Sequence, residues 1–205
     1  GVITFIVNSM AAEHENPTVE KILQPHQQLF QGTGNLKGVE VTLQIDDTFT
    51  PVAQAPRRIP HNLKKNVNAK LEEMRENGII EKVDGVTPWL SPLIAIPKKT
   101  GDVRLVLDMR LPNIALIRRQ VQIPTVDEIL HQMEGATFFT EVDLSQGYHQ
   151  LTLSKKSQYI TAFSTPDDGP HQFTRLIMGA SPSSEYFHEI IANLIKDVPR
   201  CANIS

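Results

Sequence analysis

The residue of this 205-residue chain whose setting most favours chemistry is Asp143. It follows residues 137–142, an aromatic and β-branched run that is typical of a β-strand. A carboxylate at the exit of a hydrophobic strand is held rigidly at a sheet edge and suits Mg²⁺, which binds one or two carboxylates together with substrate phosphates. The alternative, which an isolated Asp would favour, is a residue that begins a turn before Gly147. Glu141 shares a face of the strand with Asp143, and we interpret it as a solvated strand residue rather than a second ligand.

Several other kinds of site are excluded by spacing. Residues 144–147 lack the leading Gly of a serine-hydrolase nucleophile elbow, and no Gly-rich phosphate loop ends in Gly-Lys-Ser/Thr. The seven histidines occur at no metal-binding spacing such as HExxH. The sequon at residues 203–205 is interpreted as a chance match, because one cysteine and no disulfide framework indicate a reducing, intracellular compartment.

Composition and charge describe ordinary globular material with an uneven charge distribution. The chain is 40% hydrophobic and has a formal net charge of −3, and it contains no apolar stretch of the ~20 residues that would cross a bilayer. Residues 55–120 carry 13 Lys+Arg and 7 Asp+Glu, whereas both flanking segments are acidic. This basic middle is either a polyanion-binding surface or scatter on a solvated surface. The apolar start has no basic n-region and no initiator Met, so we expect the chain to be a fragment.

The elements that must position Asp143 alternate between helix and strand, which favours an α+β fold over a doubly wound parallel sheet. Residues 1–54 are expected to be a loosely organised lead-in with one alternating strand at 39–45. Pro60 opens a helix with an apolar stripe that ends at Gly78. Two strands, 93–97 and 103–109, form a hairpin with a basic tip.

The second half of the chain continues this mixed order. Thr125 and Glu128 form a capping box for a helix that stops at Gly135. Strands are predicted at 159–164 and 172–177, with a turn that contains Asp167-Asp168 between them. A last helix follows the cap Ser181-Pro182, and its predicted apolar face consists of Phe187, Ile190, Ile191, Leu194 and Ile195.

Six short blocks follow one another along the chain. They are Gly78-Ile79-Ile80-Glu81, Thr87-Pro88-Trp89-Leu90-Ser91-Pro92, Pro97-Lys98-Lys99, Arg104-Leu105-Val106-Leu107-Asp108-Met109-Arg110, Ile123-Pro124-Thr125-Val126-Asp127-Glu128-Ile129-Leu130 and Val142-Asp143-Leu144-Ser145-Gln146-Gly147-Tyr148-His149-Gln150. Their order and spacing resemble those of reverse transcriptases of gypsy-like LTR retrotransposons, from about Leu29 to the C-terminus. Six blocks in order are a much more specific signal than any single one.

The resemblance implies a right-hand polymerase that is truncated within the palm. Residues 55–118 and 151–182 would form the fingers, and residues 119–150 and 183–205 the palm. Residues 1–54 would link the polymerase to an upstream protease. The expected partners are a primed RNA or DNA template, dNTPs and the rest of the Pol polyprotein, namely protease, RNase H and integrase. No membrane partner is expected. The implied location is a cytoplasmic virus-like particle, with nuclear entry left open.

Site residues carry over from the resemblance one by one. Asp143 matches the first metal-binding, catalytic Asp, and the backbone carbonyl of Leu144 would be a neighbouring ligand. Tyr148 matches the aromatic gate that excludes a ribose 2′-OH; its alternative is an ordinary core Tyr. Arg104 with Lys98 or Lys99 matches the fingers cations that grip the triphosphate.

Further matches concern the template and the pocket floor. Met178-Gly179 falls where the family usually has Phe-Gly at the template and nucleotide pocket, although the proline that follows lies two positions early. The remaining nucleic-acid-binding residues would be Arg57, Arg58, Lys64 and Arg110.

Catalysis in this family uses two Mg²⁺ ions and a second acidic site, an adjacent Asp-Asp pair. Asp167-Asp168 precedes the Gly179 block and lies in a Pro/Gly-rich turn, so we interpret it as a loop. Residues 204–205 fall where the family has the residues before the pair. We therefore expect the 205-residue chain alone to be inactive. The alternatives are a non-catalytic nucleic-acid-binding remnant of a retroelement and a partial gene product without activity.

Overall fold

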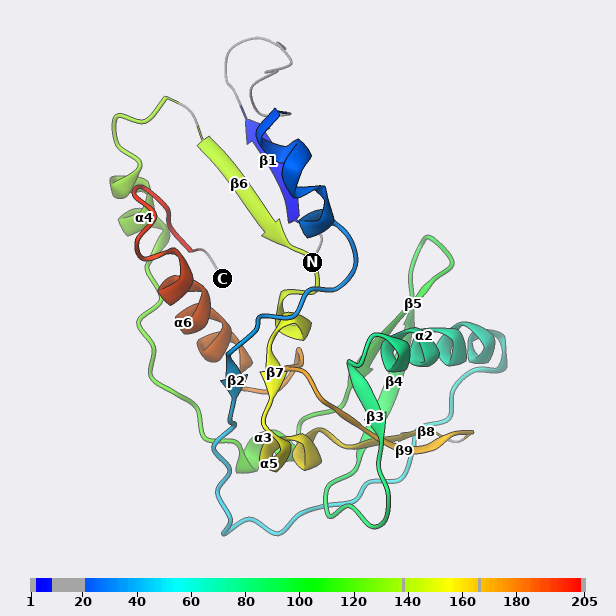
Figure 1. Ribbon diagram of the computed structural model, residues 1–205. Helices are drawn as coiled ribbons and strands as arrows, with labels where there is room; N and C mark the ends of the chain where they lie inside the picture. Colours follow the sequence, from blue (N-terminus) through cyan, green and yellow to red (C-terminus); the bar gives the residue numbers. More distant parts are fainter. Residues whose placement is uncertain (1–2, 9–20, 138, 166, 204–205) are drawn as a thin grey trace.

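The computed structural model describes residues 3–8, 21–137, 139–165 and 167–203 (Figure 1). Helices and strands alternate without a repeating unit, which confirms the α+β class. In chain order, with η for a 3₁₀-helix, the elements are β1 (Ile3–Asn8), η1 (Gln24–Phe30), β2 (Glu40–Val41), η2 (His61–Leu63), α2 (Lys64–Glu76), β3 (Ile80–Lys82), β4 (Ser91–Pro97), β5 (Val103–Leu107), α3 (Pro112–Ala115), α4 (Val126–Gln132), β6 (Phe139–Leu144), η3 (Gly147–Gln150), β7 (Thr152–Leu153), α5 (Lys155–Gln158), η4 (Tyr159–Thr161), β8 (Phe163–Thr165), β9 (Gly169–Phe173) and α6 (Ser183–Ile195).

The largest sheet has five strands in the order β3-β9-β8-β4-β5. Its neighbours are antiparallel except for β4 and β8, which are parallel. Helix α2 contacts this sheet at β3 and β5 and buries Val67, Leu71 and Met74 of the predicted apolar stripe. Buried residues of α2 and of this sheet belong to the main hydrophobic core. Burial of large apolar side chains is the dominant stabilising contribution to a fold.

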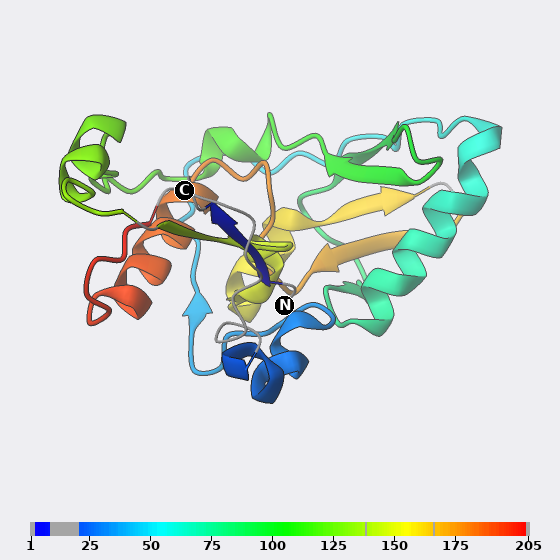
Figure 2. The ribbon, with the colours of Figure 1, turned by 90° about the horizontal axis from the view of Figure 1, so that it is seen from above.

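Two further pairs of strands complete the described structure. Strands β2 and β7 are parallel, and β1 and β6 are antiparallel. Both views place the β1–β6 pair on the side of α4 and α6, whereas α2 and the five-stranded sheet form the other side (Figures 1 and 2). Among the described residues, none of the helices has the length and apolar character needed to cross a membrane.

Several local predictions are confirmed. The helix after Pro60 stops just before Gly78: α2 ends at Glu76 with Asn77 as its C-cap, and Gly78 has a φ of 61°, a left-handed conformation that favours glycine. The basic hairpin forms as β4 and β5. The capping box of α4 is present in both directions, since the Thr125 hydroxyl accepts from the Glu128 amide and the Glu128 carboxylate accepts from the Thr125 amide.

The predicted strand at 39–45 is wrong in extent. Only residues 40–41 pair with another strand, and the Leu43 amide donates to the Ser157 hydroxyl at 2.9 Å instead of joining a ladder. The alternation that suggested a strand is nevertheless real, because Val41 and Leu43 are buried and Gln44 is exposed. The lead-in is therefore not loosely organised throughout, since this part of it belongs to the core.

The predicted strands at 159–164 and 172–177 are also misplaced. Residues 155–161 form α5 and η4, and the Thr161 hydroxyl closes a turn by donating to the Gln158 carbonyl at 2.6 Å. Gly169, with a φ of 74°, lets the chain reverse early, so β9 starts at that residue. Beyond β9, the Leu176 amide donates to the Leu151 carbonyl, which lies outside the five-stranded sheet.

Two further predictions fail around β6 and α6. Strand β6 extends to Leu144, so Asp143 lies within the strand rather than after it. Helix α6 has Pro182 at its N-cap position without a side-chain cap, so the predicted Ser181 cap is wrong. The predicted apolar face is only partly covered, with Leu194 52% exposed. The buried residues of α6 are instead Ser183, Glu185, Tyr186 and His188. Arg118 binds Glu185, and the Tyr186 hydroxyl donates to the Thr42 carbonyl.

Candidate nucleotide and nucleic-acid site

Asp143 is an exposed carboxylate on β6. In the register with β1 it lies opposite Thr4, and Leu144 lies opposite Ile3. Within the described part of the chain its carboxylate makes no hydrogen bond or ion pair, and no three His, Cys, Asp or Glu side chains gather to hold a metal. Glu141 is exposed as well, in line with its interpretation as a solvated residue. Asp143 is thus a single carboxylate that is available to a ligand.

Tyr148 lies in the short helix η3 that follows β6 and is half-buried. Its ring packs against Phe187 of α6, with ring centroids 5.0 Å apart and planes at 43°. A Cβ atom on Gly147 would lie 2.7 Å from the Phe187 ring, so any residue other than glycine at this position would force a shift. Helix α6 therefore fixes the position of the tyrosine ring.

Arg104, Met178 and Gly179 come together although about 75 residues separate them in sequence. Arg104 extends from β5, and its Nη2 donates to the Met178 sulfur at 3.3 Å. Gly179 has a φ of 97°, a conformation that a residue with a side chain rarely adopts. Asn113 of α3 ties this loop down: its Nδ2 donates to the Gly179 carbonyl at 2.8 Å, and its Oδ1 accepts from the Ser181 amide at 2.9 Å.

Lys98 and Lys99 lie in the exposed turn between β4 and β5. The Lys98 ammonium is 3.4 Å from the Asp102 carboxylate, a long ion pair between half-exposed side chains. Such a contact contributes little to stability, so it leaves the charge available to a phosphate. Asn66 of α2 donates to the Gly101 carbonyl at 2.8 Å and anchors the turn.

Arg57 and Arg110 both bind Asp108, whose side chain is 6% exposed. Arg110 is bidentate, with both nitrogens 2.7 Å from the carboxylate oxygens, and Arg57 Nη2 lies 2.6 Å from Oδ2. The hydrogen bond from Arg110 lowers the pKa of Asp108 and raises that of Arg110. One carboxylate cannot neutralise two guanidiniums, so the group keeps a net positive charge at its exposed surface.

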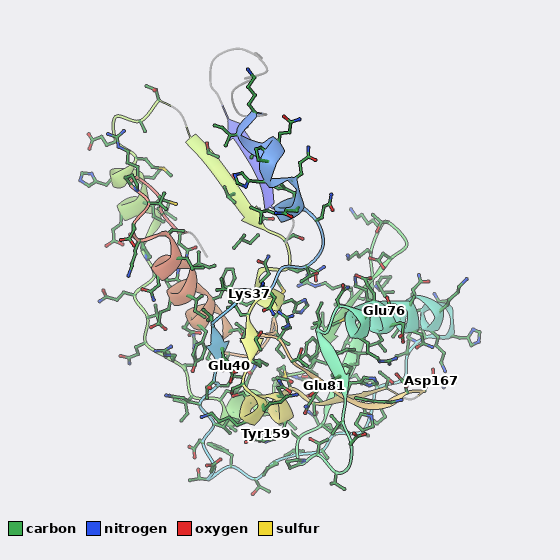
Figure 3. All side chains as sticks on the ribbon, in the orientation of Figure 1. Lys37, Glu40, Glu76, Glu81, Tyr159 and Asp167 are labelled. Atoms are coloured by element: carbon green, nitrogen blue, oxygen red, sulfur yellow. The ribbon has the colours of Figure 1, made fainter. Side chains whose placement is uncertain are left out.

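Lys64 and Arg58 lie near the start of α2. Lys64 binds Asp167, and Arg58 lines a shallow hollow together with Ile59, Pro60 and His61. Asp167 and Asp168 form a turn, as predicted, and Figure 3 shows Asp167 at the outer end of the β8–β9 hairpin. Asp168 binds Lys82 and Arg75 at 2.8 and 2.5 Å, so this acidic pair holds the hairpin to β3 and α2.

His149, next to Tyr148, is kept neutral. Burial lowers its pKa to about 4, with a smaller contribution from the Arg175 charge. Its ring stacks on Phe173 at 6.0 Å, and its carbonyl accepts a hydrogen bond from Arg175 at 3.4 Å. The imidazole therefore acts as a packing group that joins η3 to β9.

The structure thus brings the predicted site residues together in three places. One holds Arg104, Met178 and Gly179, and another holds Arg57 and Arg110. Asp143 and Tyr148 follow each other along β6 and η3, and the described hydrogen bonds and ion pairs join neither of them to the other two places. Sequence reasoning missed Asp108, Asn113 and Phe187 as partners of site residues. Asp108 lies two residues before Arg110 and Asn113 three residues after it, and this proximity to a predicted site residue is the signal that could have indicated them.

Comparison with protein families and curated proteins gives consistent similarities. Residues 96–204 match the family described as "Reverse transcriptase (RNA-dependent DNA polymerase)". The chain is 32% identical over 163 residues to the retrovirus-related Pol polyprotein from transposon 412 of Drosophila melanogaster. The aligned region covers 77% of this chain and 13% of that protein. It is 27% identical over 199 residues to the Pol polyprotein from transposon opus of the same organism, covering 92% and 20%. The chain therefore spans a fifth or less of the length of these relatives.

Solved structures of similar fold include one from prototype foamy virus. Its protease-reverse transcriptase superposes with a TM-score of 0.81 at 22% identity, covering 93% of this chain and 26% of that one. The foamy viral protease-reverse transcriptase in complex with an RNA/DNA hybrid gives a TM-score of 0.76 at 23% identity, covering 95% and 26%. At these identities the similarity establishes the fold.

Proposed function

This chain belongs to the reverse transcriptase (RNA-dependent DNA polymerase) family, among the Pol polyproteins of LTR retrotransposons, and from this membership we propose that it carries the fingers and part of the palm of an RNA-directed DNA polymerase. The reaction would extend a primer with dNTPs by nucleotidyl transfer. Fingers at 55–118 and 151–182 and palm at 119–150 and 183–205 are the division that we propose.

The observation that carries the proposal is the uncommitted carboxylate of Asp143. Buried Asp108 and half-buried Asp168 are each bound by at least two cations, whereas Asp143 is exposed and has no described partner. An unpaired carboxylate oxygen is the donor that Mg²⁺ prefers, so the residue fits the metal that the family generally uses. Asp143 and the Leu144 carbonyl would hold it, and bound Mg²⁺ would lower the pKa of the primer hydroxyl and neutralise phosphate charge.

The incoming nucleotide would bind between the β4–β5 hairpin and the loop at Gly179. Arg104 supplies a planar guanidinium and Lys98 or Lys99 a point charge, and both kinds of cation suit a triphosphate. Tyr148, held by Phe187, would lie under the sugar and exclude a 2′-OH by its bulk. The backbone at Met178-Gly179 would allow close approach, because Gly179 has no side chain.

A primed template would contact the cations Arg57, Arg58, Lys64 and Arg110. Each phosphate contact by such a cation releases counterions, so binding should weaken steeply with salt. Solved foamy viral protease-reverse transcriptases of similar fold are in complex with ds DNA and with an RNA/DNA hybrid. We propose the same classes of nucleic acid for this chain.

Two-metal transfer needs more than one acidic site, and Asp143 is a single carboxylate. We therefore propose that the 205-residue chain alone does not polymerise and that a longer stretch of the polyprotein does. The test is dTTP incorporation on poly(rA)·oligo(dT) with Mg²⁺ by both proteins. We expect product only from the longer one. Robust synthesis by the 205-residue chain would contradict the division of the active site, and none from either would contradict the polymerase function.

The same preparation tests the non-catalytic alternative. If the chain is only a nucleic-acid-binding module, RNA binding will depend on salt but not on Mg²⁺, and replacement of Arg57, Arg58 and Lys64 by Ala will abolish it. Incorporation of dTMP by the longer protein would exclude this alternative.

A further inference from the structure

We propose that Asn113 is the positioning residue for the nucleotide pocket at Met178 and Gly179. The inference rests on the proposed function, because it assigns the residue that sets the shape of that pocket. Asn113 was not among the site residues indicated by the sequence. It lies in α3, 65 or more positions away from the loop that it binds.

The amide of Asn113 uses both of its ends on this loop. Nδ2 donates to the Gly179 carbonyl at 2.8 Å, and Oδ1 accepts from the Ser181 amide at 2.9 Å. A side-chain amide is matched to this task, because it carries one donor group and one acceptor in a fixed plane. The two contacts hold the residues on either side of Ala180 at a fixed separation.

Few other polar contacts hold the loop. In the described structure the buried hydroxyls of Ser181 and Ser183 have no hydrogen-bond partner. Gly179 adopts a φ of 97°, and a Cβ there would meet only ordinary contacts, at 3.8 Å from Met109 and 4.0 Å from the Leu107 carbonyl. Crowding therefore does not force the conformation of Gly179. Beside the burial of Ala180 and the hydrogen bond from the Ser183 amide to the Ala180 carbonyl, the two contacts to Asn113 restrain the loop.

Asn113 is itself fixed by the backbone. Its backbone amide donates to the carbonyl of Met109, which lies between Asp108 and Arg110 in sequence, at 2.8 Å. The loop that it holds presents Met178 to Arg104 and leads into α6, whose Phe187 packs on Tyr148. One side chain thus links the proposed triphosphate cation, the pocket floor and the helix behind the proposed sugar gate.

The test uses two substitutions with different consequences. Asn113→Asp keeps an oxygen for the Ser181 amide but turns a carboxylate oxygen toward the Gly179 carbonyl, whereas Asn113→Ala removes both contacts. Asn193→Asp, at an exposed position of α6, is the matched control. In the 205-residue chain we expect the Ser181 amide to exchange about fivefold faster in Asn113→Ala and at the wild-type rate in Asn113→Asp, since one hydrogen bond is worth about that factor.

In the longer polymerase, both Asn113 variants should raise the KM for dNTP about fivefold or more with kcat changed less than twofold. A purely structural role would lower kcat and the unfolding temperature without this split. An unchanged KM with normal incorporation, or unchanged Ser181 exchange in Asn113→Ala, would overturn the inference alone. A failure of the unsubstituted polymerase to incorporate dNTP would contradict the proposed function, and the inference with it.

Discussion

The two sides of the molecule differ in how completely their apolar side chains are buried. Around the five-stranded sheet, Phe163, Leu153, Ile80 and Val67 are each 2% exposed or less. On the side of β6 and α4, Ile129 is buried, but Val126, Leu130 and Val142 are between 48% and 69% exposed. Since burial of apolar area drives folding, the side of the five-stranded sheet should be the stable unit and the β6 side the weakly stabilised one.

The carboxylates differ as well, although Glu185 and Glu189 of α6, on the β6 side, bind Arg118 and Arg119. Around the five-stranded sheet, Lys or Arg side chains bind Asp108, Asp167, Asp168 and Glu81. On the β6 side, Asp143 has no described partner. The cation-bound carboxylates around the sheet thus contrast with Asp143, which is free for a ligand, as expected of a scaffold and its reactive edge.

The largest difference should appear when one apolar side chain is truncated on each side. Phe163→Ala should lower the free energy of unfolding by about 3–5 kcal/mol, because it leaves a cavity in the core. Val142→Ala should lower it by less than about 1 kcal/mol, because the side chain is already half-exposed. Urea denaturation measures both. Equal losses would show that the two sides share one core.

A smaller effect concerns the half-buried His149 at the junction of the two sides. Its pKa is about 4 in the folded chain and near 6.5 when unfolded, so between these values the unfolded state binds more protons. This contribution to stability is complete above pH 6.5 and is lost as the pH falls toward 4. Between pH 7 and pH 4.5 the free energy of unfolding should fall by about 2 kcal/mol through this imidazole.

His149→Gln should remove that part of the pH dependence, and the exposed His131 of α4, replaced by Gln, serves as the control. Buried His171 has a lowered pKa as well and remains in every variant. Urea denaturation at both pH values measures the difference between the variants. Wild-type pH dependence in His149→Gln would show that this imidazole is not held neutral.

The smallest effect tests whether α4 opens independently. Thr125→Ala removes the N-cap and should cost about 1 kcal/mol, so amides of α4 should exchange about fivefold faster. Amides of β8 and β9 should keep their wild-type exchange rates. In the control Thr50→Ala, at an exposed position, amides of α4, β8 and β9 should all exchange at the wild-type rate. Faster exchange throughout the five-stranded sheet would contradict the independence of the two sides.

Elements set by local chemistry could be predicted from the sequence. The capping box at Thr125, the glycine stop at Gly78 and the basic hairpin each depend on residues close in sequence, and all three form. Elements set by distant partners could not. Strand 39–45 shrinks to two residues because β7 offers only two partners, and the buried face of α6 depends on Arg118 and Thr42.

The candidate site shows the same limit. The six blocks indicated the family, which the comparisons confirm. Residue types also suggested which cations could bind phosphate. What remained hidden were the neutral and acidic side chains that hold them, Asn113, Phe187 and Asp108, because their contacts reach 51 to 68 positions along the chain or join two helices through space. The roles of the site residues stay predictions.

The central claim is that Asp143 is the metal-binding carboxylate of a polymerase. Its most direct test is Mg²⁺-dependent dTMP incorporation by the longer polymerase carrying Asp143→Asn, beside Glu141→Gln on the same strand. We predict a loss of at least about a hundredfold for Asp143→Asn, since a metal ligand contributes several kcal/mol to the transition state, and near wild-type activity for Glu141→Gln. Both proteins should unfold at the wild-type urea concentration. Incorporation by Asp143→Asn within twofold of wild type would contradict the assignment.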